Sequence, residues 1–232
     1  ITIGPALLTA PDARFLASGG SVIDATTASD VAYSTRGLTT GSQSVIDATG
    51  AGTQVRLPSI QSWDGSHGHT TSGTIYQRVT ASDGGSVDLS NLQSVVLPVN
   101  LEDWLEVDLT GGGTVDLSSL ATIPGAGGRF KFDAHTGGNL SLPGLQTVED
   151  TWFNVDGGGQ ISVNGAQPVS YASNGLVFAT NYVFSAFDAG SSLDLSSITS
   201  WDGSYTHTTS GAISQLVLAD GGSIDLSGLA TI

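Results

Sequence analysis

The sequence predicts an all-β fold, a parallel β-solenoid wound as a right-handed β-helix, with essentially no helix. Three observations predict it: a motif of 12 residues that recurs along the chain, an alternation of apolar and polar residues inside it, and a pair of glycines at its start. Repeats of about 20–50 residues are typical of solenoids, in which each coil contacts only its neighbours. Aligned copies of the motif predict coils of 21 to 32 residues.

The recurring motif predicts one short strand and a second apolar segment in every coil. Val87 and Leu89 alternate with polar neighbours, which is the pattern of a half-buried strand. Asp88 between them is expected to point outward. The Gly-Gly pair before the strand is expected to supply the positive φ that a corner requires. The clearest copies are Gly84–Val95, Gly112–Ile123, Gly137–Val148 and Gly221–Ile232, and weaker copies begin at Gly52, Gly158 and Gly190.

A longer strand is expected to close each coil before the next Gly-Gly pair. Candidate segments combine β-branched and aromatic residues with an apolar–polar alternation, which favours strands. Together with the two segments of the motif, they predict three strands per coil. The segments are Asp103–Asp108, Arg129–His135, Thr151–Asp156, Tyr182–Phe187 and Ile213–Leu218.

The regularity of the motif divides the chain into two regions. Residues 52–232 carry regular coils, whereas residues 1–51 are expected to form irregular or degenerate coils, with copies at Gly20–Ala25 and Gln43–Ala48. A longer repeat relates residues 57–73 to residues 195–211 at an offset of 138. The motif stops at Ile232, where a further coil should begin. We therefore expect the regular coils to continue beyond residue 232, as part of a longer rod.

Composition excludes several classes of protein. The formal net charge of −15 comes from 21 acidic and 6 basic residues, and such a surface repels nucleic acid and anionic lipid. The chain has no cysteine, so disulfides, thiolate metal sites and cysteine nucleophiles are excluded. No apolar run approaches the roughly 18–20 residues of a membrane span. The sequence thus predicts no nucleic-acid partner and no membrane insertion of this segment.

The motif resembles the repeats of known surface proteins. The string Leu142–Val148, followed by a strand and a Gly-Gly pair, is similar to coils of receptor L-domains and of related fungal cell-wall proteins. The pattern at Gly221–Leu229 resembles more closely the repeats of very large bacterial surface proteins, notably those of planctomycetes. The resemblance covers about residues 52–232. It implies a parallel β-solenoid outside the cell or on its surface, with a non-catalytic role in adhesion, matrix or cell-surface structure.

The outward aspartates of the motif form a predicted ladder, because coils stack about 4.8 Å apart. One interpretation is that neighbouring carboxylates supply the oxygen ligands that Ca²⁺ prefers. The other is that each carboxylate is hydrated and caps the amides of its own turn. The candidate calcium ligands are Asp88, Asp116, Asp194 and Asp225, with Arg56, Ser141 and Ser162 at the equivalent positions of other coils.

A duplicated loop contains the candidate ligand-binding residues. An exposed Trp with a nearby Asp and His could stack on a sugar ring and hydrogen-bond its hydroxyls. Alternatively, the Trp fills a core position, because it aligns with Val95 and Ile123 of other coils. His67 and His69 could lie on one strand face, but a zinc site would need further ligands. The candidates are Trp63, Asp64 and His69 in the first copy and Trp201, Asp202 and His207 in the second.

Together these features predict a non-enzymatic structural or adhesive solenoid, extracellular or on the cell surface, that associates end to end with itself or with other surface proteins. The alternative is a carbohydrate-binding or calcium-dependent adhesion module, with Ca²⁺ as its cofactor and glycans as partners. A glycan-active enzyme is the third hypothesis, because a hydrolase needs only two carboxylates at a suitable separation. A polysaccharide lyase is the other enzyme considered, but it needs Arg or Lys to bind the carboxylates of its substrate and to act as base, and the six basic residues are spread along the sequence. No Gly-x-Ser-x-Gly elbow, phosphate loop or dinucleotide fingerprint occurs.

Overall fold

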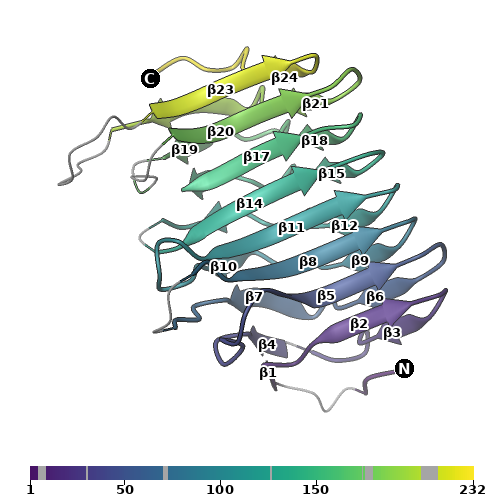
Figure 1. Cartoon of the computed structure of the whole chain (residues 1–232). Coiled ribbons are helices and arrows are strands. Elements are labelled where there is room, and N and C mark those ends of the chain that lie inside the picture. Colours follow the sequence, from purple (N-terminus) through teal and green to yellow (C-terminus); the bar gives the residue numbers. More distant parts are fainter. Residues whose placement is uncertain are drawn as a thin grey trace.

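The computed structural model describes residues 1–4, 9–29, 31–69, 73–125, 127–173, 175, 180–204 and 214–232. Over these residues the chain winds as a parallel β-solenoid, from the N-terminus near the bottom of Figure 1 to the C-terminus at the top. The front strands run from left to right and the return strands lie behind them, so the rising coil is right-handed (Figure 1). No helix occurs among the described residues. The predicted all-β solenoid is confirmed.

Three strands per coil build three faces of the solenoid. The long sheet contains β2 (Phe15–Ser18), β5 (Gln43–Thr49), β8 (Tyr76–Ser82), β11 (Trp104–Thr110), β14 (Arg129–Ala134), β17 (Thr151–Val155), β20 (Thr180–Phe187) and β23 (Ser214–Asp220). The second sheet contains β1 (Thr9–Pro11), β4 (Val31–Ser34), β7 (Ile60–Asp64), β10 (Ser94–Val96), β13 (Thr122–Ile123), β16 (Thr147–Glu149), β19 (Val169–Ala172) and β22 (Ile198–Asp202).

The third face consists of two four-stranded sheets of three-residue strands, and we call it the short-strand face. One sheet contains β3 (Val22–Asp24), β6 (Gln54–Arg56), β9 (Ser86–Asp88) and β12 (Thr114–Asp116). The other contains β15 (Asn139–Ser141), β18 (Gln160–Ser162), β21 (Ser192–Asp194) and β24 (Ser223–Asp225). All pairings between named strands are parallel. The long segments predicted from the sequence correspond to β11, β14, β17, β20 and β23 of one sheet, which confirms three strands per coil.

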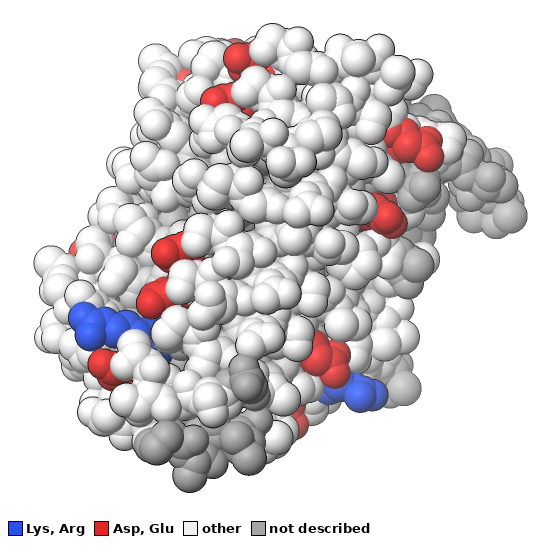
Figure 2. Space-filling view, turned by 180° about the vertical axis from the view of Figure 1, so that it is seen from behind, with Lys and Arg blue, Asp and Glu red and all other residues white. Residues whose placement is uncertain are grey.

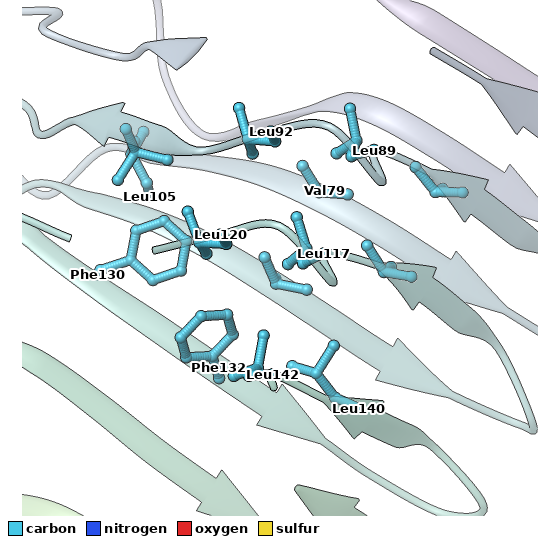
Figure 3. Close-up of a cluster of buried hydrophobic side chains, with 14 of the residues drawn as sticks. Val79, Leu89, Leu92, Leu105, Leu117, Leu120, Phe130, Phe132, Leu140 and Leu142 are labelled. Atoms are coloured by element: carbon cyan, nitrogen blue, oxygen red, sulfur yellow. The ribbon is translucent and has the colours of Figure 1, made fainter. Parts of the chain in front are cut away.

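Apolar side chains from the three faces meet in one core that follows the solenoid axis. In β8 every second residue is buried, as the sequence alternation predicts. Figure 3 shows Leu89, Leu117 and Leu142 of successive coils in one column, with Phe130 and Phe132 of the long sheet nearby. None of these five side chains is more than 2% exposed. The leucine of the motif therefore points inward in each coil.

The two glycines of each pair meet different requirements. The first adopts a positive φ, +76° at Gly112, as the sequence predicts. The second touches the preceding coil: a Cβ added to Gly113 would lie 2.0 Å from the carbonyl oxygen of Ala81. Gly85 would meet the carbonyl oxygen of Ala48 at the same distance. At Gly85 and Gly113 only a residue without a side chain permits this approach to the preceding coil.

The 138-residue repeat of the sequence is also a structural repeat. The Trp63 indole N–H donates to Thr35 Oγ1 at 2.9 Å, and the Trp201 indole N–H donates to Ser173 Oγ at 2.8 Å. In both copies the hydroxyl in turn donates to the side-chain oxygen of a glutamine 42 residues further along the chain. The polar network that crosses this part of the core is thus duplicated together with its sequence.

The N-terminal strands stack on the same three faces as the later coils. The two similar strings in this region do not occupy equivalent positions: Gly20–Ala25 contains β3 of the short-strand face, whereas Gln43–Ala48 lies in β5 of the long sheet. The hypothesis that both are copies of one coil segment is wrong, because a Val-Ile pair suits a strand on either face. Asp24 pairs in register with Arg56, so the ladder of outward residues already begins at β3.

We expect Gly113→Ala to destabilise the solenoid more than Gly112→Ala. A methyl group at Gly113 collides with the backbone of Ala81, which should cost about 3 kcal/mol. Gly112 has open space around it and loses only its tolerance of positive φ, at about 1–2 kcal/mol. Urea denaturation measures both values. Equal losses in the free energy of unfolding would show that contact between coils does not require a glycine at the second position.

Candidate functional site

The predicted ladder lies in register on the short-strand face. The pairs are Asp88 with Asp116 and Asp194 with Asp225, and Ser141 with Ser162 lies between them. Each aspartate accepts a hydrogen bond from the backbone amide two residues further on, at 2.8–3.1 Å. Figure 2 shows acidic side chains in small groups on the back of the molecule, separated by uncharged surface. These hydrogen bonds from backbone amides are the ones that the turn-capping interpretation predicts, and they occupy one oxygen of each carboxylate.

A groove of about 470 Å³ crosses this face and includes Asp88 and Asp116 in its lining, together with Arg56. It reaches the break in the face, where β12 and β15 are not hydrogen-bonded to each other. Within the described ranges, no three His, Cys, Asp or Glu side chains form a group that could hold a metal ion. Calcium stays a prediction, and Asp88 with Asp116 is the pair best placed for it because the two share the groove.

The duplicated loop does not bring its candidate residues together at the surface. Trp63 is 2% exposed and pairs in register with Val95, so its ring is not available to stack on a sugar. Asp64 stays near the surface, where its carboxylate lies 3.8 Å from Arg36 Nε and caps the amide of Ser66. The geometry therefore favours the core alternative for Trp63 over the sugar-binding one.

The second copy of the loop shows the same arrangement at the last strand of its sheet. Trp201 is partly exposed, because β22 is the end strand, and its ring packs 5.4 Å from that of Phe184, centroid to centroid. Asp202 caps the amide of Ser204 at 2.9 Å. His207 lies outside the described residues. Trp201 thus occupies the same core position as its counterpart in the first copy.

His69 joins a buried polar cluster instead of an exposed site. Its Nε2 lies 3.0 Å from Asp103 Oδ1, and His67 Nε2 lies 3.5 Å from Asp103 Oδ2. None of the three side chains is more than 5% exposed. Burial lowers the pKa of His67 and outweighs the opposing charge of Asp103, so its imidazole is mainly neutral at pH 7. The three side chains link the segment after β7 to the start of β11.

The outer face of the long sheet carries a group of charged residues that does not stand out in the sequence. Strands β8, β11 and β14 place Arg78, Glu106 and Lys131 side by side in register. Glu106 is 5% exposed; Arg78 Nε contacts its Oε2, and Lys131 Nζ lies 3.2 Å from its Oε1. Lys131 also contacts Asp133, which is 4% exposed and accepts a 3.0 Å hydrogen bond from Asn154. We call these five residues the charged cluster.

Burial and mutual contact change the acidity of the charged cluster. Burial raises the pKa of Asp133 to about 6, assisted by Glu106 and opposed by the charge of Lys131. Burial also acts to raise the pKa of Glu106, but the hydrogen bond with Asp133 and the charges of Lys131 and Arg78 together lower it. In mildly acidic solution Asp133 therefore holds a proton, and Glu106 accepts the hydrogen bond that this proton forms.

His135 lies beside the charged cluster, between two carboxylates of neighbouring coils. Its Nδ1 is 2.8 Å from Asp156 Oδ1, and its Nε2 is 3.8 Å from Asp108 Oδ1. Burial acts to lower the pKa of His135, but the hydrogen bond to Asp156 and the charges of Asp156, Asp133 and Asp108 together raise it. Burial raises the pKa of Asp108, and the charge of His135 offsets part of this effect. A protonated imidazole is thus favoured at this point of the sheet.

A cavity of about 240 Å³ lies on this face over β14, β17 and β20. Its lining combines aromatic residues (Trp152, Tyr182 and Phe187) with polar ones (Lys131, Asp133, His135, Asn154, Asp156 and Ser185). Tyr182 is 41% exposed, whereas Trp152 is partly buried and packs edge-on against Trp104, with ring centroids 4.7 Å apart. The Trp152 indole N–H is buried without a hydrogen-bond partner among the described residues. Aromatic surface, donors and acceptors therefore meet in one cavity.

Strand register is the signal that could have identified this face. Three of the six basic residues gather on it although they are spread in the sequence: Arg78 and Lys131 in the charged cluster, and Arg129, whose guanidinium lies 5.0 Å from the Trp104 ring centroid. Outward residues become neighbours when each long strand is aligned on the glycine of positive φ that follows it. The residues six positions before Gly84, Gly112, Gly137 and Gly158 are Arg78, Glu106, Lys131 and Trp152.

Comparison of the chain with protein-family models, with curated proteins and with solved structures finds no match. Among the described residues there is no helix long and apolar enough to cross a membrane. The function is therefore inferred from the geometry and chemistry of the sites described above.

Asp133→Asn should remove a pH-dependent loss of stability. Between about pH 4 and 6 the folded chain keeps the Asp133 proton that the unfolded chain releases, so the free energy of unfolding falls as the pH rises. At about 1.4 kcal/mol per pKa unit, this loss amounts to roughly 2–3 kcal/mol by pH 7. The asparagine amide can still donate to Glu106 at every pH. The variant should therefore gain stability relative to wild type between pH 4 and 7.

Urea denaturation of both proteins at a series of pH values measures this gain. Carboxylates that do not interact with Asp133 contribute equally to the two proteins, so the difference between the two curves reports on Asp133 and on the groups coupled to it, Glu106 and His135. A difference that is constant from pH 4 to 7 would contradict a raised Asp133 pKa.

Proposed function

We propose that the chain is a non-enzymatic, adhesive module of an extracellular or cell-surface structural protein, and that it binds a glycan on the outer face of the long sheet. The observation that carries this proposal is the cavity of about 240 Å³ in which Trp152 and Tyr182 lie beside charged and amide side chains. Aromatic rings cover the apolar faces of sugar rings, while a few polar groups hold the hydroxyls.

The size and lining of the cavity suit one sugar unit of a longer chain. Pockets for drug-sized ligands measure about 300–1,000 Å³, and this cavity is smaller. Tyr182 offers open ring surface, and Asp156, whose side chain is 43% exposed, offers a carboxylate that can accept from a sugar hydroxyl. Ser185 is buried, and its hydroxyl donates to Asn154 Oδ1 at 2.6 Å and so holds this amide in place. The neighbouring units of the glycan would lie over the outward side chains of adjacent coils.

The charged cluster supports binding over catalysis. A glycosidase needs one carboxyl group free to protonate the glycosidic oxygen and a second one free to attack the sugar or activate water. Here the two oxygens of Asp133 contact Asn154 and Lys131, and those of Glu106 contact Arg78 and Lys131. We assign these carboxylates a positioning role, in which they hold the polar side of the cavity in place.

The solenoid provides a rigid support for the cavity. Beneath it, Phe132, Phe153 and Phe184 are completely buried and stack in sequence, with centroid distances of 5.2 and 5.9 Å. Such close packing resists rearrangement of the sheet above it. A binding face held on a stack of coils suits an adhesive role, because the site keeps a fixed orientation when the ligand is under load.

Binding to a panel of immobilised neutral, acidic and amine-bearing glycans tests the proposal. The wild-type protein should bind at least one of them, and Tyr182→Ala should weaken that binding about tenfold by removing exposed ring surface. Val96→Ala is the matched control, because Val96 is 48% exposed but lies on the second sheet. Circular dichroism checks that both variants fold.

Absence of binding to every glycan, or an equal loss in both variants, would refute a binding site at this cavity. The same glycans, incubated with the protein and analysed by mass spectrometry, should yield no shorter products. Any shortened product would refute the non-enzymatic part of the proposal.

A calcium ion shared by Asp88 and Asp116 would stabilise the short-strand face. The two carboxylates pair in register, and like charges opposite each other destabilise a sheet unless a cation lies between them. Added Ca²⁺ should raise Tm by about 2–4 °C for each kcal/mol of stabilisation, and a chelator should reverse the shift. Asp116→Asn should abolish the shift, whereas Asp225→Asn in the other sheet should retain it. A Tm indifferent to Ca²⁺ would eliminate the calcium hypothesis for this pair.

A further inference from the structure

We propose that the glycan selected by the cavity is amine-bearing, a chain of hexosamine units with free, protonated amino groups. This inference rests on the glycan-binding function proposed above and specifies which class of glycan the same cavity takes. Two features lead to it: the basic side chains near the cavity are already paired with carboxylates, and the most exposed charged side chain in its lining is the carboxylate of Asp156.

The basic side chains of the charged cluster are already paired with carboxylates. Arg78 contacts Glu106, and Lys131 lies between Glu106 and Asp133. The Arg78 and Lys131 side chains are only 32% and 22% exposed. A uronate or sulfate group at either one would compete for its charge with a buried carboxylate, and weakening such a buried ion pair is unfavourable. The cavity therefore disfavours acidic glycans.

The most exposed charged side chain in the lining of the cavity is a carboxylate. The Asp156 side chain is 43% exposed, against 36% for His135 and 22% for Lys131. Asp108, whose side chain is 29% exposed, lies on the other side of His135 and outside the lining. An ammonium group carries three donors and one positive charge, and it would form charge-assisted hydrogen bonds with Asp156, the more exposed carboxylate.

The aromatic part of the cavity fits the sugar ring that carries the ammonium group. Trp152 and Tyr182 provide apolar surface for a ring face. The formal net charge of −15 adds a long-range attraction for a polycationic chain over a neutral or acidic one.

Titration calorimetry with four soluble β-1,4-linked or α-1,4-linked oligosaccharides of equal length tests the inference. They are oligomers of glucosamine, N-acetylglucosamine, glucose and galacturonate, measured at low salt and mildly acidic pH, where the amino groups of the glucosamine oligomer are protonated. We expect the glucosamine oligomer to bind at least about tenfold more tightly than the N-acetylated one. This preference should shrink as salt is added, because salt screens exposed charges. The galacturonate oligomer should not bind.

Asp156→Asn identifies the carboxylate responsible, because it removes the charge and keeps the size of the side chain and an acceptor for His135. In this variant the glucosamine oligomer should bind within about threefold of the N-acetylated one. Asp194→Asn removes one charge from the short-strand face and should keep the full preference. Equal wild-type affinity for the two oligomers, or a preference that persists in Asp156→Asn, would overturn the inference and leave glycan binding intact. Binding to none of the four would overturn the proposed function as well.

Discussion

The stacking of coils at the spacing of hydrogen-bonded parallel strands is the constraint on which the rest of this structure depends. Neighbouring strands lie about 4.8 Å apart, so each side chain has the equivalent residues of the adjacent coils as its nearest neighbours on that face. The second glycine of each pair permits this spacing at the corner, where Gly113 approaches the backbone of Ala81. Leucines consequently stack on leucines in the core, and Asp88 lies opposite Asp116 at the surface.

The same constraint explains which parts of the fold could be predicted from the sequence. The alternation of Val87 and Leu89 with polar residues determines the buried side of a strand locally, so the strands, their orientation and the core were all predictable. A local pattern does not determine where in the coil a strand belongs. Gly20–Ala25 and Gln43–Ala48 share the string Ser-Val-Ile-Asp-Ala, yet they lie on different faces, because each is positioned by the corner glycines and loop lengths around it.

The candidate site was less predictable, because its properties arise between coils. Irregular coil lengths hide the register of Arg78, Glu106 and Lys131 unless the strands are aligned on the glycines that follow them. Even then, polar residues at outward positions are expected to be hydrated. Glu106 and Asp133 are almost completely buried instead, because long basic side chains of their own and adjacent coils lie against them. That burial depends on side-chain packing, which no spacing in the sequence specifies.

Comparison of the repeated coils distinguishes the positions that stabilise the solenoid from those that line the proposed binding cavity. The network of Trp63 recurs around Trp201, so it belongs to the structure that every such coil needs. Arg78 corresponds in the 138-residue repeat to Leu216, so this copy lacks the first basic residue of the charged cluster. Repeated apolar contacts already stabilise the stack, whereas buried charges are costly unless they are fully paired. The stacking of coils therefore does not explain a group of paired, buried charges at positions outside the repeat. At the cavity beside this group, the outward side chains differ from those of the other coils.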